Sequence, residues 1–390
     1  MATADTPRGV SSGSVALLST AYGLTIANLY YCQPLIPEIS RSFGPDAAGH
    51  LIAVGQLGYA LALVFVVPLG DLLPRRPLVI VLLCADVAAL AVTAAAPTPG
   101  ILLAAGVLIG LTSAAVVNIL IPYATTLAAP SERGRAVGTM LTGGLAGILL
   151  SRVIGGLVAQ AAGWRAPFAG AAIVTAVLAL ILARVMAPGP PELALPYGAQ
   201  LRATFRLAMT HRVLQRRAFI GACSFAGFGV FWSTVALRLA QPPYGYGPAQ
   251  IGLLALAGIA GACAARLIGR AADRGDALRL TRTALMLGAC SFAALWAGGR
   301  HLAWLLIGLV AMDTALHAVH LLNMSAVYGI DEARARLASV YMTTYTLGGV
   351  AGAAAGPIAY SYGGWTATCL LGAVLLTTAL VTTIARTDGP

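Results

Sequence analysis

A row of polar side chains interrupts the apolar segment 302–328. Asp313 is followed by His317, His320 and Asn323 at plus 4, plus 7 and plus 10, a spacing that keeps all four on one broad face of an α-helix. A carboxyl group in a medium of low dielectric constant favours its neutral form, and an imidazole titrates near neutral pH. Asp313, His317 and His320 are therefore candidates for taking up and releasing protons, and Asn323 is a candidate for binding a substrate.

The composition indicates what surrounds this row. Of 390 residues, 59% are hydrophobic and 9% are charged, whereas a soluble domain has roughly 25% charged residues. The apolar residues form about twelve blocks, most of them long enough for an α-helix to cross about 30 Å of hydrocarbon. We predict an all-α membrane protein with twelve transmembrane helices, the first of them retained rather than cleaved as a signal peptide. The predicted spans are 14–36, 49–69, 77–96, 100–127, 136–161, 166–187, 217–239, 249–268, 279–298, 302–328, 337–361 and 366–386.

The basic residues orient the chain. The formal net charge of +11 would also suit a nucleic-acid partner, but almost all the arginines fall on one side of the predicted membrane. By the positive-inside rule, that side is the cytoplasm. We therefore expect both termini in the cytoplasm, a bacterial inner membrane, a lipid bilayer around the chain and no nucleic acid. The six cysteines lie singly and indicate neither a disulfide framework nor a metal cluster.

The chain contains an internal repeat. Six residues of the fifth span and its flanks recur 201 positions later: Arg133, Arg135, Gly147, Gly155, Gly163 and Trp164 match Arg334, Arg336, Gly348, Gly356, Gly364 and Trp365. A constant offset over a whole helix indicates duplication. We predict a six-helix bundle over 1–187, a cytoplasmic linker over 188–215 with several arginines, and a second six-helix bundle over 216–390.

Two loops that follow the second and eighth spans share a pattern of glycine, acid and arginine. Asp71 and Asp273 are 202 residues apart. Glycine lets the next helix approach, and the acid can accept hydrogen bonds from a helix N-terminus or pair with arginine. We interpret these loops as contacts that lock one face of the protein and break when it rocks. The gating residues are Gly70, Asp71, Arg75, Arg76, Gly269, Asp273 and Arg274.

These loops, the duplication and the sequence Gly-Trp-Arg at 163–165 resemble the major facilitator superfamily over essentially the whole chain. The resemblance implies two pseudo-symmetric six-helix bundles, with the first, fourth, seventh and tenth spans lining a central cavity. It would therefore aim the Asp313 row at water. Residues 27–39 and 340–349 also resemble a less characterised bacterial branch of exporters.

The fifth span resembles that of drug/proton antiporters and also departs from it. Those proteins usually carry Gly-x-x-x-Gly-Pro-x-x-Gly-Gly, and this chain has Ser151 and Arg152 at the central pair. An arginine stays charged, so inside a membrane it needs a carboxylate, carbonyl groups or an anionic substrate. Arg152 either clamps a substrate or alternately holds an acid such as Asp313, or it forms a static pair with Asp86 of the third span.

Polar and aromatic residues on several spans could line a substrate pocket. Each of them could equally be ordinary packing or an anchor at the membrane interface. Together with Arg152 and Asn323, the candidates are Asn28, Tyr31, Gln33, Asn118, Phe228, Trp232, Tyr341 and Tyr345.

The resemblance implies a secondary transporter, most simply one that exports a small organic molecule in exchange for protons by alternating access, as a monomer. A proton symporter or facilitator for uptake of a sugar or another metabolite is the alternative. A remote alternative is an intramembrane metallohydrolase with Asp313, His317 and His320 as ligands, but no fourth strong ligand and no HExxH pair is present. We expect no cofactor, no metal and no enzymatic activity, and the sequence contains no nucleotide-binding P-loop.

Overall fold

The computed structural model describes residues 12–187, 196–260, 277–330 and 334–384, and these ranges contain helices and no strand. The first half comprises α1 (Ser12–Ala27), η1 (Gln33–Leu35), α2 (Ile36–Phe43), α3 (Pro45–Leu61), η2 (Ala62–Val66), α4 (Leu69–Leu72), α5 (Arg75–Ala95), α6 (Pro99–Leu127), α7 (Arg133–Ala162) and α8 (Ala166–Val185). The second comprises α9 (Tyr197–Thr210), α10 (Arg212–Leu239), α11 (Pro248–Leu253), η3 (Leu254–Leu256), α13 (Ala277–Ala297), α14 (Leu302–Tyr328) and α15 (Arg334–Ile384).

The prediction of twelve spans in an all-α membrane protein is confirmed. Nine helices in the described residues are long and apolar enough to cross a membrane. One of them, α15, contains two spans that meet at Gly363 and Gly364, where the backbone leaves the helical conformation. Two shorter apolar helices, Gly13–Ala27 and Pro248–Ala260, occupy the positions of the first and eighth spans. The part of the predicted eighth span beyond residue 260 lies outside the described residues.

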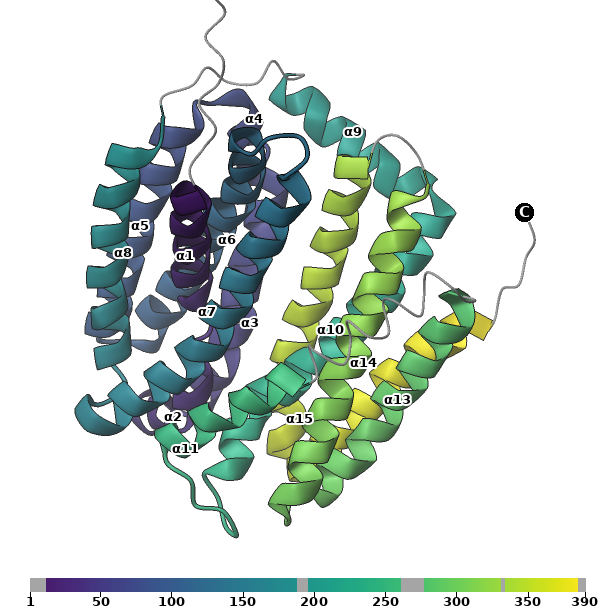
Figure 1. Ribbon diagram of the computed structural model, residues 1–390. Coiled ribbons are helices and arrows are strands. Elements are labelled where there is room, and N and C mark those ends of the chain that lie inside the picture. The colour runs from purple at the N-terminus through teal and green to yellow at the C-terminus, as the bar shows by residue number, and fades with distance from the viewer. Residues whose placement is uncertain (1–11, 188–195, 261–276, 331–333, 385–390) are drawn as a thin grey trace, which may run out of the picture.

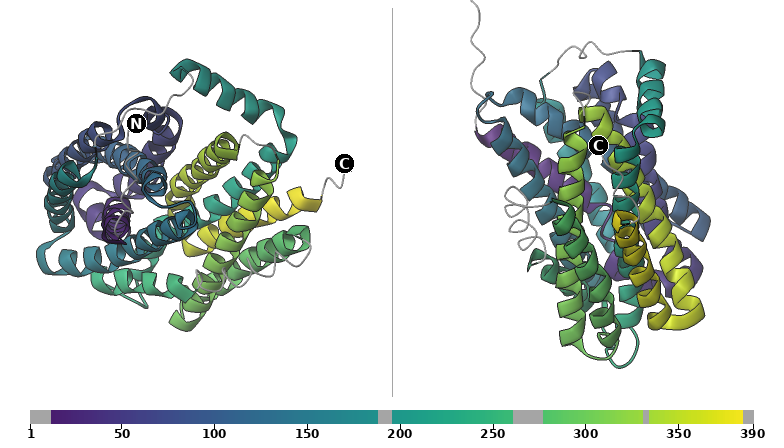
Figure 2. Two further views of the ribbon diagram at one scale, coloured as in Figure 1. Left: turned by 45° about the horizontal axis from the view of Figure 1, so that its top comes forward. Right: turned by 90° about the vertical axis from the view of Figure 1, so that its right-hand side faces the viewer.

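The helices form two groups (Figure 1). One group contains α1 to α8, and the other contains α10, α13, α14 and α15, while α9 crosses between them at one end of the molecule. Viewed from that end, α9 lies at the periphery (Figure 2). The Tyr197 hydroxyl at the start of α9 donates to the carbonyl of Phe65 at 2.8 Å, and Leu207 and Ala208 near its end pack on buried residues of α10 and α15. We call this end of the molecule the α9 end.

The repeated glycines perform the same packing task in both groups. Gly147 of α7 lies directly against the backbone of Gly23 in α1, and Gly348 of α15 lies against the backbone of Ala222 in α10. A methyl group at either glycine would overlap those backbone atoms, so the helices can pack this closely only because a side chain is missing. The 201-residue offset is therefore also an offset between equivalent helix contacts.

The first span is not the continuous helix predicted over 14–36. The α-helix α1 ends at Ala27, after which the backbone forms i to i+3 bonds, such as Asn28 N to Thr25 O at 3.2 Å and Gln33 N to Tyr30 O at 3.2 Å. Pro34 has no N–H to donate, which favours this break in the i to i+4 ladder. The tighter turns place the side chains of 28–35 differently from an α-helix. The linker predicted over 188–215 contains the helix α9, for which no helix was predicted.

Candidate functional site

A cavity of about 830 Å³ separates the two groups of helices at the α9 end. Its walls come from η2, α4, the first turn of α5 and α6 on one side and from α14 and α15 on the other. Gln200 and Thr204 of α9 also line it. A cavity of this volume lies within the range of about 300–1,000 Å³ typical of sites for small molecules.

The fourth and tenth spans, α6 and α14, line this cavity through Asn118 and Met324, and no residue of α1 or α10 is among its lining residues. Residues of the first and seventh spans, Gln33 and Trp232, instead line a small space beside Arg152. Close glycine contacts hold α1 against α7 and α10 against α15. The second and eleventh spans take their place in the wall.

The two groups touch at the opposite end of the molecule, through a shared cluster of buried apolar side chains and through close contacts of several glycines. A Cβ on Gly49 of α3 would lie 2.6 Å from Cβ of Pro357 in α15. Gly156 of α7 lies against the carbonyl of Pro248 in α11, and Gly252 of α11 lies against the carbonyl of Arg152 in α7. The protein is thus open at the α9 end and closed at the other.

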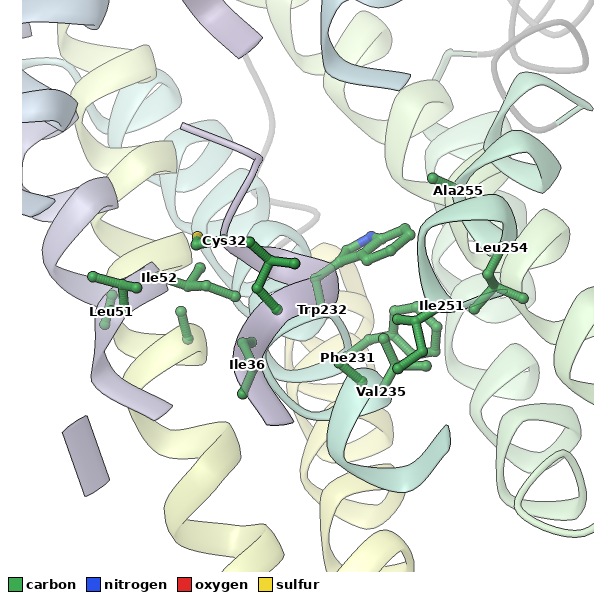
Figure 3. Close-up of a cluster of buried hydrophobic side chains, with 14 of the residues drawn as sticks. Cys32, Ile36, Leu51, Ile52, Phe231, Trp232, Val235, Ile251, Leu254 and Ala255 are labelled. Carbon is green, nitrogen blue, oxygen red and sulfur yellow. The ribbon is translucent and has the colours of Figure 1, made fainter. Parts of the chain in front are cut away.

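Arg152 lies between these two ends, at the contact of the two groups. It is 4% exposed, and its Nε donates to Oε1 of Gln33 at 2.5 Å. Its guanidinium stacks on the Trp232 ring at 3.8 Å from the centroid and lies over the Tyr30 ring at 5.2 Å. The tightened segment 28–35 carries Gln33 and Tyr30, while α10 carries Trp232, so both groups of helices hold this cation. Figure 3 shows Trp232 between the α2 segment that carries Ile36 and the α11 segment that carries Ile251.

Asp313 of α14 approaches the same place from the second group. It is 4% exposed, and its Oδ2 would lie 2.8 Å from a Cβ on Gly258, so only a glycine leaves room for the carboxyl group there. Asp313 and Arg152 influence one another electrostatically, yet no ion pair within 4.0 Å joins them in the described part of the chain. The static pair of Arg152 with Asp86 is also absent from the described ion pairs.

Three polar atoms at this contact are buried without a hydrogen-bond partner among the described residues. They are Nη2 of Arg152, Nε1 of Trp232 and Oδ1 of Asp313. A space of about 10 Å³ beside Arg152 and Trp232 is close to the smallest that admits one water. Buried polar groups are normally satisfied, and the exceptions need an explanation. Two donors and one acceptor at this contact therefore point toward one another from the two groups of helices without a described partner.

The other members of the predicted polar row lie elsewhere. His317 is exposed, and its Nδ1 lies 2.7 Å from the carbonyl oxygen of Asp313 on the same helix. His320 faces the eleventh span, with Nδ1 at 3.3 Å from the hydroxyl of Tyr341 and its ring 4.8 Å from that of Tyr345. No described hydrogen bond links the Asp313 carboxyl group to either imidazole, and no three described acids, histidines or cysteines could hold a metal ion. The geometry therefore does not favour the metallohydrolase.

Asn323 belongs to the same cluster as His320, towards the α9 end of the second group. It is buried, and its Oδ1 accepts from Nη1 of Arg217 at 3.3 Å. Within the described structure its Nδ2 has no hydrogen-bond partner. His320, Asn323, Tyr341 and Arg217 form a polar cluster inside the second group, between Asp313 and the α9 end.

The remaining predicted residues divide between the cavity, the contact and the core. Asn118 lines the cavity and donates to the Tyr59 hydroxyl at 3.3 Å. Tyr31 packs against Gly155, and the ring centroids of Phe228 and Trp232 are 5.9 Å apart. Asn28 faces away from the cavity into the first group, where its amide donates to Asp86 at 2.8 Å.

The predicted gating residues of the first half lie at the cavity. Gly70, Asp71 and Arg75 line it, and Arg75 approaches Asp71 at 3.9 Å and donates to the carbonyl of Gly70 at 3.3 Å. Arg76 donates to the carbonyl of Ala183 at the end of α8. Their equivalents Gly269, Asp273 and Arg274 lie outside the described residues.

Sequence reasoning missed two residues of this site. Tyr30, which is not among the predicted pocket residues, lies under the guanidinium of Arg152. Gly258 makes room for Asp313. Pro34 and Pro37 were the available signal for Tyr30, because they indicate that an α-helix cannot pass regularly through this segment.

The fold and the site define a class: membrane carriers with two related helical halves, a central ligand site and closure at one end at a time. The family model described as Major Facilitator Superfamily matches residues 18–330. The chain belongs to this superfamily, and it is a multi-pass membrane transporter.

Several relatives are similar over most of the chain. The uncharacterized transporter YgaY of Escherichia coli O157:H7 is 39% identical over 94% of this chain and 93% of its own. The probable transporter SCO4007 of Streptomyces coelicolor is 34% identical over 95% of this chain and 86% of its own. The chloramphenicol efflux pump Rv0191 of Mycobacterium tuberculosis is 28% identical over 73% of this chain and 70% of its own.

Solved structures share the fold at low identity. A bacterial homolog of the human lysosomal transporter Spinster, in an inward-facing and unoccupied conformation, gives a TM-score of 0.75 at 16% identity and covers 97% of this chain and 95% of that one. The nucleoside transporter NupG gives a TM-score of 0.77 at 12% identity, and the match covers 96% of this chain and 99% of that one.

Proposed function

We propose that the protein exports a small organic molecule from a bacterial cell in exchange for protons, with Asp313 as the coupling acid. Both termini and the α9 end lie in the cytoplasm, in agreement with the arginines of the central connection. The described conformation is then inward-facing. The similarity to a chloramphenicol efflux pump supports export, and a drug of that kind is the first substrate to test.

One observation carries the proposal. Arg152 of the first group and Asp313 of the second are opposite charges, both buried, and each has a polar atom without a partner among the described residues. Their separation exceeds 4.0 Å, so at an effective dielectric constant of 20 their attraction is below about 4 kcal/mol. That is enough to bias two conformations and small enough for one ligand to reverse the bias.

This pair gives a rule for exchange. When Asp313 is ionised and the site is empty, its attraction to Arg152 holds the end opposite α9 closed. A proton on Asp313 removes one charge, and a substrate that contacts Arg152 or Asp313 competes with the other partner for the same atoms. Either ligand therefore weakens the attraction that holds the closed end. Because the proton and the substrate compete for the same pair, we propose that the carrier binds one of them at a time, which is a condition for exchange.

The test uses the full chain in proteoliposomes with a pH gradient and chloramphenicol as the first probe, followed by a panel of aromatic drugs. We expect Asp313→Asn to abolish flux driven by the pH gradient, while the same compound still shifts the thermal unfolding of the purified variant. Glu132→Gln, which changes an exposed acid at the start of α7, is the matched control and should transport normally. Undiminished pH-driven flux in Asp313→Asn would remove Asp313 from the mechanism.

A further inference from the structure

A second acid is buried in the first group of helices, away from the contact with Arg152. Asp86 of α5 is 0% exposed. Its two oxygens lie within hydrogen-bond distance of Nδ2 of Asn28 at 2.8 Å, of Oγ1 of Thr112 at 2.8 Å and of Oγ of Ser113 at 3.2 Å. These partners come from the segment after α1 and from α6.

The hydrogen-bond partners of the Asp86 carboxyl group are all uncharged. The groups that reach Asp86 from α6 and from the segment after α1 are hydroxyls and one amide, and from α8 only the Thr175 hydroxyl joins the network, through Asn28. No arginine, histidine or second acid of the described residues contributes to its surroundings. An ionised carboxylate is very costly to bury without a cation, and a buried acid without one generally becomes neutral instead.

The hydrogen bonds of Thr112 are independent evidence that Asp86 is neutral. Its hydroxyl has one hydrogen, yet its Oγ1 lies 2.8 Å from Oδ1 of Asp86 and also 2.8 Å from the carbonyl of Leu108. A threonine inside a helix readily donates to the carbonyl four residues before it. If the Thr112 hydrogen goes to Leu108, a second hydrogen must lie between Thr112 and Asp86, and only a protonated Asp86 supplies it.

We propose that Asp86 is a second proton-binding site, which holds a proton in the conformation described here. The chain of hydrogen bonds then runs from the Asp86 hydroxyl to Thr112 and on to Leu108, while Asn28 and Ser113 donate to Asp86. A proton at Asp86 is thereby held in the first group, and a proton at Asp313 in the second.

Asp86 connects to the candidate site through the tightened segment. Asn28, which donates to Asp86, is the first residue after α1, and Gln33 at the end of the same run of i to i+3 turns binds Arg152. Loss of the Asp86 proton would strengthen the bond from Asn28 and end the donation to Thr112, so the charge of Asp86 is coupled to the segment that carries Gln33. A role of Asp86 in proton carriage rests on the proposed function, whereas its protonation does not.

Infrared difference spectroscopy of the purified full-length protein tests the protonation directly. A protonated carboxylic acid has a C=O stretching band that is separate from the carboxylate bands and shifts in deuterated water. We expect this band in the wild type at neutral pH, its loss in Asp86→Asn, and its retention in the control Glu132→Gln. Loss of carboxylate bands alone in Asp86→Asn would overturn the proposal, as would a carboxylate band that shifts when sodium chloride replaces choline chloride, because Asp86 would then hold a cation.

The variant itself is informative because asparagine mimics a neutral acid. Its amide can donate to Thr112 and its oxygen can accept from Asn28, so we expect Asp86→Asn to melt at the wild-type temperature. Destabilisation of Asp86→Asn together with unchanged stability of the wild type between neutral and alkaline pH would contradict a neutral Asp86.

Transport then tests the coupling role separately. In proteoliposomes, we expect Asp86→Asn to carry one proton fewer for each substrate molecule than the wild type. An unchanged ratio would overturn the role in carriage. Wild-type protein that moves no protons would refute the proposed function, while the infrared result on Asp86 would stand.

Discussion

The contact between Gly252 and Arg152 offers a direct way to shift the protein between its two conformations. A Cβ added at Gly252 would overlap the Arg152 carbonyl oxygen and lie 3.1 Å from its carbon and 3.4 Å from Cα of Val153. These distances are shorter than the roughly 3.5–4.0 Å of unstrained carbon contacts. The neighbours are backbone, which cannot rotate away, so Gly252→Ala must push the two groups apart at the closed end.

The size of the effect follows from the contact. An extra methyl group in a well-packed place typically costs about 1–3 kcal/mol, which shifts the ratio of the two conformations by about 5- to 150-fold. The cost falls only on the conformation that is closed at this end. We therefore expect Gly252→Ala to increase the population that is open there and closed at the α9 end.

Distances between spin labels measure this population. The labels are attached to cysteines introduced at Arg41 in α2 and at Arg300 before α14, both exposed near the closed end, in a background without the native cysteines. They should show a longer distance with Gly252→Ala than without it. Gly170→Ala in α8, where a Cβ would meet nothing within 4 Å, is the matched control and should leave the distribution unchanged. Identical distributions in all three proteins would refute the reasoning.

Two further predictions concern buried polar groups. Gln33→Leu removes the acceptor of the Arg152 Nε bond, so we expect the free energy of unfolding to fall by about 1–3 kcal/mol. Denaturation in detergent measures this loss. Gln33→Glu keeps an acceptor and should be at least as stable as the wild type. Arg217→Leu leaves the Oδ1 of the buried Asn323 without its donor, and a similar loss of about 1–3 kcal/mol is expected. The exposed Arg212→Leu should have no effect, and equal stability of all these variants would show that the polar contacts are not formed.

Much of the architecture could be predicted because the bilayer imposes it. The membrane fixes the length of each span, and the repeat from Gly147 to Gly348 fixes equivalent contacts in the two halves. Two local features were not predicted. The linker contains the helix α9, and the backbone of the first span tightens near Pro34. There the backbone chemistry of proline outweighs the hydrophobic pattern.

The site was only partly predictable, because its contacts are tertiary. Arg152 and Asp313 were identified as costly residues inside the membrane, but the partner of Arg152 turned out to be Gln33, 119 positions away, and not Asp86. Asp313, His317 and His320 share one helix, yet small differences in direction on that helix send His317 to an exposed position and His320 to the eleventh span. Spacing predicts a shared face, and the neighbouring helices decide what each side chain meets.

The separation of the closed end from the cavity has an evolutionary consequence. Gly156 contacts Pro248 and Gly252 contacts Arg152 at the closed end, and none of these residues lines the 830 Å³ cavity, so substitutions of its wall side chains leave those contacts intact. Descendants of this chain can therefore acquire new cargoes by changing the lining alone, while they inherit the same moving parts.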